Sequence, residues 1–244
     1  MAPEWRGCSL AALLIGGGQP LRLLSCFADE AGQQDMGAGY YMLTLVMHDQ
    51  DDGLAPFIDA YGARLALEGL PDIPFHDVDL IHGHGRYENV TVEVRKRLLI
   101  AFSMFVRTLP VSYKTFSYSS GDVPDRDALQ SRMRRDIVNF VFEHLEWFQA
   151  YDKVPIYYDS GHGATTVALH EAFDYALARD VAVYKELSHE TKRLAQAADY
   201  LSSIELARSR YEVGDVSATY RRFYGNPRNF KQNFLKQARR KLVD

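Results

Sequence analysis

The sequence predicts an α/β domain in which helices cover both faces of a mixed β-sheet. Short apolar or aromatic runs of strand length alternate with longer segments in which apolar residues recur at helical spacing. The first two such runs, 21–28 and 40–47, are separated by a polar, glycine-containing turn, which is typical of an antiparallel hairpin. The chain has 244 residues, 47% of them hydrophobic, so one large core needs no disulfide or metal to stabilise it.

The first strand sets the frame for the remaining elements. It is a buried apolar run that Asp29 and Glu30 close before Gly32 turns the chain. Because side chains alternate along a strand, the two acids should point to opposite faces unless the strand has already ended. Further strands are expected at 75–81, 111–118, 154–158 and 181–185, and helices at 54–68, 87–109, 126–151, 164–178, 194–211 and 228–242.

Three parts of different composition are expected along the chain. Residues 1–20 form a flexible leader or follow from a start codon assigned too far upstream, since their apolar run lacks a signal-peptide cleavage site. Residues 21–215 form the domain. Residues 216–244 carry eight Lys or Arg and one acid, Asp244, and form a basic helical extension packed on it.

Charge, hydropathy and cysteine content indicate which classes of protein the sequence does not fit. The net charge of −4 argues against a uniformly basic nucleic-acid-binding surface but leaves local patches open. No apolar run is long enough to span a membrane. Cys8 and Cys26 have no metal-ligand spacing, and Cys26 lies inside the first strand, so we expect a reduced, cytoplasmic setting.

Three acidic residues stand out by their positions. Asp29 ends the first strand, Asp159 ends the Val154–Tyr158 strand, and Asp199 lies in a mostly apolar stretch of the helix at 194–211. Gln196 is three residues before Asp199 and so shares its helix face. Parallel strand ends covered by a helix could bring the three carboxylates together.

Two carboxylates about 4 Å apart repel by roughly 4 kcal/mol at an effective dielectric constant near 20, so they favour a bound cation. Oxygen ligands suit Mg²⁺ or Mn²⁺, and two such ions can activate water and stabilise the leaving oxygen of a phosphodiester. The simpler interpretations stay open: Asp29, Glu30 and Asp159 are turn residues, and Asp199 is a helix-surface charge or a cap partner.

Four short segments then resemble a known family. They are 27–32 (FADEAG), 75–80 (FHDVDL), 157–160 (YYDS) and 196–201 (QAADYL), and their order and spacing over about 21–235 are similar to domain-of-unknown-function family 3800. Ala31 stands where that family usually has Ser. The resemblance implies a ribonuclease-H-like fold and metal-dependent nuclease chemistry. It also implies Asp29, Asp159 and Asp199 as metal ligands, Glu30 as a fourth, His76 as an active-site partner and Gln196 as a second-shell or substrate contact.

Other residues of the chain are consistent with different kinds of site. His76, His82 and His84 could bind zinc with Asp77 and Asp79. In the segment 159–163, Ser160 could act as a nucleophile, although G-x-S-x-G is absent, and His162 at a helix start could contact phosphate. The tail interleaves cations with aromatic residues, which suits either phosphate binding with base stacking or a closing helix that docks Phe230 and Phe234 on the core.

These observations predict a Mg²⁺- or Mn²⁺-dependent phosphodiesterase, a nuclease whose substrate backbone is held by the tail and by cations of the helix at 126–151. Two alternatives stay open. The first is a non-catalytic ribonuclease-H-like binding module, with a protein partner, in a larger defence or mobile-element assembly. The second is an enzyme like type 2 ribonuclease H, because 29–32 (DEAG) also occurs there, although Gln33-Gln34 replaces its usual Arg-Gly.

Overall fold

The structure is a computed structural model that describes residues 21–32, 39–121, 123–158, 163–177, 182–185 and 193–243. For residues 163, 164 and 182–185 it describes the backbone alone. The leader at 1–20, Asp159, Ser160 and His162 therefore lie outside the described residues.

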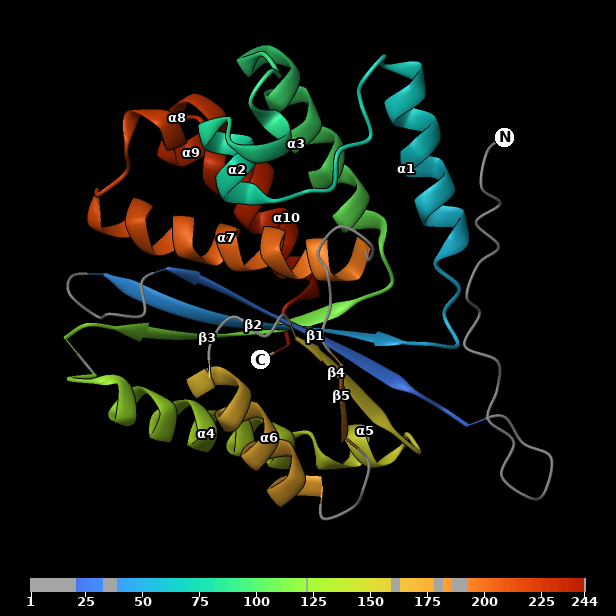
Figure 1. Ribbon diagram of the computed structural model, residues 1–244, viewed down its shortest axis with the longest axis vertical. Helices are drawn as coiled ribbons and strands as arrows, with labels where there is room; N and C mark the ends of the chain where they lie inside the picture. Colours follow the sequence, from blue (N-terminus) through green and yellow to red (C-terminus); the bar gives the residue numbers. More distant parts are fainter. Residues whose placement is uncertain are drawn as a thin grey trace.

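The described residues form one mixed sheet of five strands in the order β3-β2-β1-β4-β5 (Figure 1). The antiparallel pairs are β1–β2 and β2–β3, and the parallel pairs are β1–β4 and β4–β5. This order and these directions are those of a ribonuclease-H-like fold, so the predicted fold class is confirmed. The strands are β1 (Leu24–Gly32), β2 (Tyr40–Asp49), β3 (Ser112–Ser119), β4 (Val154–Tyr158) and β5 (Ala182–Lys185).

Helices cover both faces of the sheet (Figure 1). On one face lies the long helix α7 (Arg193–Val213), with α1 (Ala55–Leu67), α2 (Asp77–His82), α3 (Val92–Thr108) and α8 (Ala218–Tyr224) farther out. On the other face lie α4 (Arg126–Glu143), α5 (Leu145–Gln149) and α6 (Gly163–Leu177). Each face has its own apolar core, so the central strands, covered on both faces, are mainly apolar, with Ser25, Thr44 and His48 as buried polar exceptions.

The chain after α8 is helical with changing geometry. It comprises α9 (Pro227–Phe230), the π-helical turn η2 (Lys231–Leu235), α10 (Lys236–Ala238) and the 3₁₀ turn η3 (Arg239–Lys241). Its aromatic residues belong to the same core as α7, where the Phe230 ring stacks on Tyr211 with a centroid separation of 4.5 Å. Beyond η3 the backbone N–H of Val243 donates to the carbonyl of Tyr113 in β3 at 2.9 Å.

Three predicted elements differ from the observed ones. The strand at 75–81 is wrong, because this segment holds the helix α2; its buried residues Asp77, Leu80 and Ile81 follow helical spacing, which a seven-residue alternation concealed. The helix predicted from residue 87 begins at Val92, after the 3₁₀ turn η1 (Gly85–Tyr87) and the cap residue Thr91. The helix predicted at 126–151 is interrupted at His144. None of the described helices is long and apolar enough to cross a bilayer.

Gly32 ends β1 in a conformation that requires glycine. Its φ is +105°, and an added Cβ would lie 1.9 Å from the carbonyl oxygen of Tyr40. We expect Gly32→Ala to lower the free energy of unfolding by about 1–3 kcal/mol. Gly62, an exposed residue inside α1 with open space at its Cβ, supplies the control, since Gly62→Ala should stabilise by about 0.5–1 kcal/mol. Urea denaturation measures both, and equal effects would contradict the prediction.

Candidate functional site

Asp29 and Glu30 lie on opposite faces of the sheet, because β1 continues to Gly32. Asp29 shares its face with Phe27, which belongs to the core covered by α7 and stacks on Tyr157 of β4 with a centroid separation of 4.7 Å. Glu30 accepts a hydrogen bond from the Tyr158 hydroxyl, on the face covered by α4 and α6. Both acids are half-buried, and only Asp29 faces the layer that carries Asp199.

The ends of β1 and β4 lie side by side. The two strands run parallel, and the last described pair in their register is Ala28 with Tyr158. Asp29 follows Ala28 in the sequence, and Asp159 follows Tyr158. Carboxyl ends of neighbouring parallel strands are where open α/β sheets bind ligands.

Gln196 and Asp199 are buried on α7, with exposed fractions of 1% and 7%. The side-chain oxygen of Gln196 accepts hydrogen bonds from the Phe75 backbone N–H at 3.2 Å and from Arg193 at 2.9 Å. Asp199 Oδ2 accepts the backbone N–H of Asp77 at 3.0 Å. The two residues therefore form the polar spot on a packed helix face that their spacing predicts, and they hold the segment that leads into α2.

Asp77, which the sequence suggested only as a possible zinc ligand, makes different contacts in this region. It is fully buried at the start of α2, and its Oδ1 accepts a hydrogen bond from the Tyr224 hydroxyl at 2.6 Å. Burial, followed by the charge of Asp199, raises the pKa of Asp77 to about 7, although the Tyr224 and Ser203 hydroxyls act in the opposite direction. One of these two neighbouring carboxyls is thus ready to hold a proton near neutral pH.

The histidines near α2 make separate contacts. His76 Nδ1 lies 3.1 Å from Asp79 Oδ2, and both side chains are partly exposed. The rings of His82 and His84 are 5.8 Å apart between centroids. Within the part of the chain that the structure describes, no three His, Cys, Asp or Glu side chains are grouped so that they could hold a metal ion. A site for Zn²⁺, Mg²⁺ or Mn²⁺ built from the described side chains alone therefore does not fit, and the predicted set depends on Asp159.

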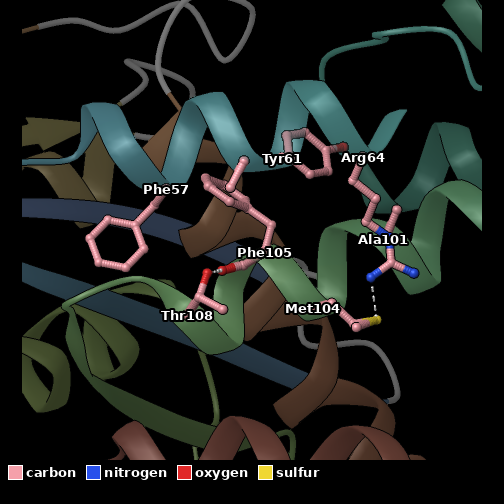
Figure 2. A pocket seen from close by; sticks show the side chains of 8 residues that line it. Phe57, Tyr61, Arg64, Ala101, Met104, Phe105 and Thr108 are labelled. Carbon is pink, nitrogen blue, oxygen red and sulfur yellow. Dashed lines mark hydrogen bonds between the residues drawn. The ribbon is translucent and has the colours of Figure 1, made fainter. Parts of the chain in front are cut away.

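Two cavities lie among the helices on the α7 side of the sheet, and different kinds of side chain line them. A cavity of about 310 Å³ beside α2 is lined by Pro74, Phe75, His76, Asp79, Gly85, Arg86 and Tyr87, so it combines polar with aromatic groups. A cavity of about 190 Å³ between α1 and α3 is mainly apolar (Figure 2). Arg64 lies at one end of this second cavity and donates to the sulfur of Met104. No carboxylate lines the second cavity, so it is separate from the candidate site.

Comparisons with known proteins give similarity in structure but not in sequence. No protein-family model matches the sequence, and no curated protein matches it. A search of solved structures found the crystal structure of the ribonuclease H2 from Pyrococcus horikoshii OT3, at 10% identity and a TM-score of 0.40. The match covers 86% of this chain and 98% of that one. The assignment of the fold here comes from the strand order and directions described above.

Proposed function

We propose that this protein is a divalent-metal-dependent phosphodiesterase, a nuclease, and that it belongs to domain-of-unknown-function family 3800. One observation carries the proposal: β1 and β4 run parallel in a register that pairs Ala28 with Tyr158, the residues bonded to Asp29 and Asp159. Asp29 also faces the layer whose helix α7 carries Asp199.

In this proposal Asp29, Asp159 and Asp199 would hold Mg²⁺ or Mn²⁺, which when bound supplies water activation and stabilises the leaving oxygen of a phosphodiester. Asp199 also positions α2 through the Asp77 backbone N–H. His76, placed by Asp79 at the rim of the polar cavity, would exchange a proton with the substrate. Gln196 would act indirectly, by fixing Phe75 beside that cavity.

The test is a nuclease assay on a panel of single strands, duplexes and RNA–DNA hybrids, with Mg²⁺, with Mn²⁺ and with chelator. We expect metal-dependent cleavage that falls at least about 100-fold in Asp29→Asn, since even outer-shell groups of metal sites cost 10–100-fold. Asp59→Asn, at an exposed position of α1, is the control and should keep full activity. Cleavage that persists in chelator and in Asp29→Asn would refute the proposal.

A second candidate is a non-catalytic binding module with the same fold. It is favoured by the use of Gln196 and Asp199 as acceptors for the backbone of 75–77. Mn²⁺ titration separates the two, because an ion bound by the native state must raise the melting temperature. A melting temperature that stays constant across millimolar Mn²⁺ would favour the module.

A further inference from the structure

Positive charge is concentrated in the last helical segment. Residues 216–243 contain eight Lys or Arg and no Asp or Glu, whereas the rest of the chain contains 20 Lys or Arg and 32 Asp or Glu. A strongly basic segment on an acidic protein produces a local positive potential that attracts polyanions. The segment is therefore basic, whereas the rest of the chain taken together is acidic.

The cations of this segment are accessible. Six of them are exposed and have no carboxylate partner among the described residues: Arg221, Arg222, Arg228, Lys231, Lys236 and Arg240. Three of the four arginines of α4 differ, because Arg134 lies 3.3 Å from Glu171, and Arg132 and Arg135 lie near Asp136. The helix predicted at 126–151 therefore has fewer cations available for a substrate than the sequence suggested. The tail has more cations available.

A hollow of about 670 Å³ gathers part of this charge. It is lined by Lys231, Gln232, Leu235, Lys236, Arg239 and Arg240, which form two rows at four-residue spacing on one side of the helical segment. The π-helical turn η2 supplies the first of these residues, and such turns often occur at functional sites. From Arg228 to Arg240 a helical chain spans about 18 Å, the axial length of about five base pairs.

One cation in the hollow is held in place. Arg239 donates two hydrogen bonds to the buried carboxylate of Glu205, from Nε at 3.0 Å and from Nη2 at 2.9 Å. Its side chain remains 41% exposed, so the rest of the guanidinium can meet a phosphate. The hollow thus combines one cation fixed by a carboxylate with three exposed cations that have no carboxylate partner among the described residues.

The aromatic residues of the same segment cannot stack on bases. Phe223, Tyr224, Phe230 and Phe234 are each 8% exposed or less and belong to the core that includes α7. Proteins that bind single strands without sequence preference commonly use exposed aromatic side chains, each stacked base contributing about 1–3 kcal/mol. This surface offers phosphate contacts alone, and a duplex presents about one charge per 1.7 Å of its axis.

We propose that the surface formed by residues 228–240 binds the sugar–phosphate backbone of double-helical nucleic acid. This inference deepens the proposed function by naming a duplex as the substrate class, and it assigns the tail as a binding site apart from the carboxylates. Binding through phosphates needs no divalent metal and reads no sequence.

The test measures fluorescence anisotropy of the full chain, in chelator, with a labelled duplex and with its separate strand; duplexes of DNA, of RNA and of the hybrid identify the backbone preferred. We expect the duplex to bind about tenfold more tightly than the strand. A triple variant of the tail, Lys231→Gln/Lys236→Gln/Arg240→Gln, removes three positive charges. It should raise the duplex Kd about tenfold or more and reduce the slope of log K against log salt by about 2.7, or about 0.9 for each charge. The control Lys96→Gln/Arg107→Gln/Lys153→Gln loses the same charge elsewhere and should keep the slope.

Each outcome has a separate meaning. Equal or tighter binding of the single strand, a slope unchanged in the tail variant, or no binding at all would overturn the inference. Duplex binding without metal-dependent cleavage would leave the inference standing and refute the proposed nuclease. Metal-dependent cleavage without duplex binding at the tail would support the proposed nuclease and refute the inference. Circular dichroism and melting temperatures verify that both triple variants are folded. We expect this because the three tail positions and Arg107 are exposed, and Lys96 and Lys153 are partly exposed.

Discussion

We expect the free energy of unfolding of the wild-type protein to fall as pH rises from about 4 to 7, and the variant Asp77→Asn to lose this pH dependence. The pKa of Asp77 is about 7 in the folded protein and near 3.8 when unfolded, so the native state binds the proton more tightly. As pH rises through this window the unfolded carboxyl ionises first, which lowers stability by about 4 kcal/mol at 1.36 kcal/mol per pKa unit. Below this window both states are protonated, and above it both are charged, so stability is flat.

Asparagine suits the position because its Oδ1 can still accept the Tyr224 hydroxyl, while the charge facing Asp199 disappears. Urea denaturation at pH 5 and pH 8 measures the effect, and the variant should gain most over the wild type at pH 8. Asp59→Asn on the exposed side of α1 should keep the wild-type dependence. If Asp77→Asn also kept the wild-type pH dependence, Asp77 would already be ionised in the native protein at pH 5.

The strands could be predicted because burial on two faces leaves an unambiguous apolar signal. In β1, Leu24 to Ala28 are all buried, and the run reads as a strand without any knowledge of its neighbours. The segment 75–81 carried a weaker signal. Its few apolar residues fit a period of two as well as one of 3.6, and the fixing contacts come from Gln196 and Asp199 on α7, far along the chain.

The candidate site also has features that the sequence predicts and features that depend on tertiary packing. The three-residue spacing of Gln196 and Asp199 predicted one buried polar spot, but their acceptor role depends on backbone amides brought there by tertiary packing. Asp77 was considered only as a possible zinc ligand. Its burial could not be predicted, because aspartates are seldom buried and its hydroxyl partner Tyr224 is 147 residues away in the sequence. The assignment of Asp159 stays a prediction, since that residue lies outside the described part of the chain.

Loss of the Glu205 carboxylate is expected to destabilise the protein more than any surface change in the tail. Glu205 lies on α7 and is 3% exposed, and Tyr113, Arg208 and Arg239 all donate to it within 3.0 Å. Burial raises the pKa of Glu205, but the hydrogen bonds and charge of these donors, Arg239 foremost, together outweigh it and lower that pKa from its ordinary value. Glu205→Leu removes the shared acceptor and leaves two guanidinium groups near an apolar side chain. We expect a loss of about 3 kcal/mol, the low end for a broken buried pair, because Arg239 is partly solvated.

The variant Glu205→Gln separates shape from charge, since its amide oxygen still accepts hydrogen bonds, and it should lose about half as much stability. Because the pKa of Glu205 is lowered on folding, its stabilisation exists above the unfolded pKa near 4.5 and is lost as pH falls below it. The Leu variant should therefore approach the wild type under acid conditions. A double-mutant cycle with Arg239→Met isolates the pair. Additive effects would show that Glu205 does not fix Arg239, and that the basic hollow has no preset guanidinium to align a phosphate.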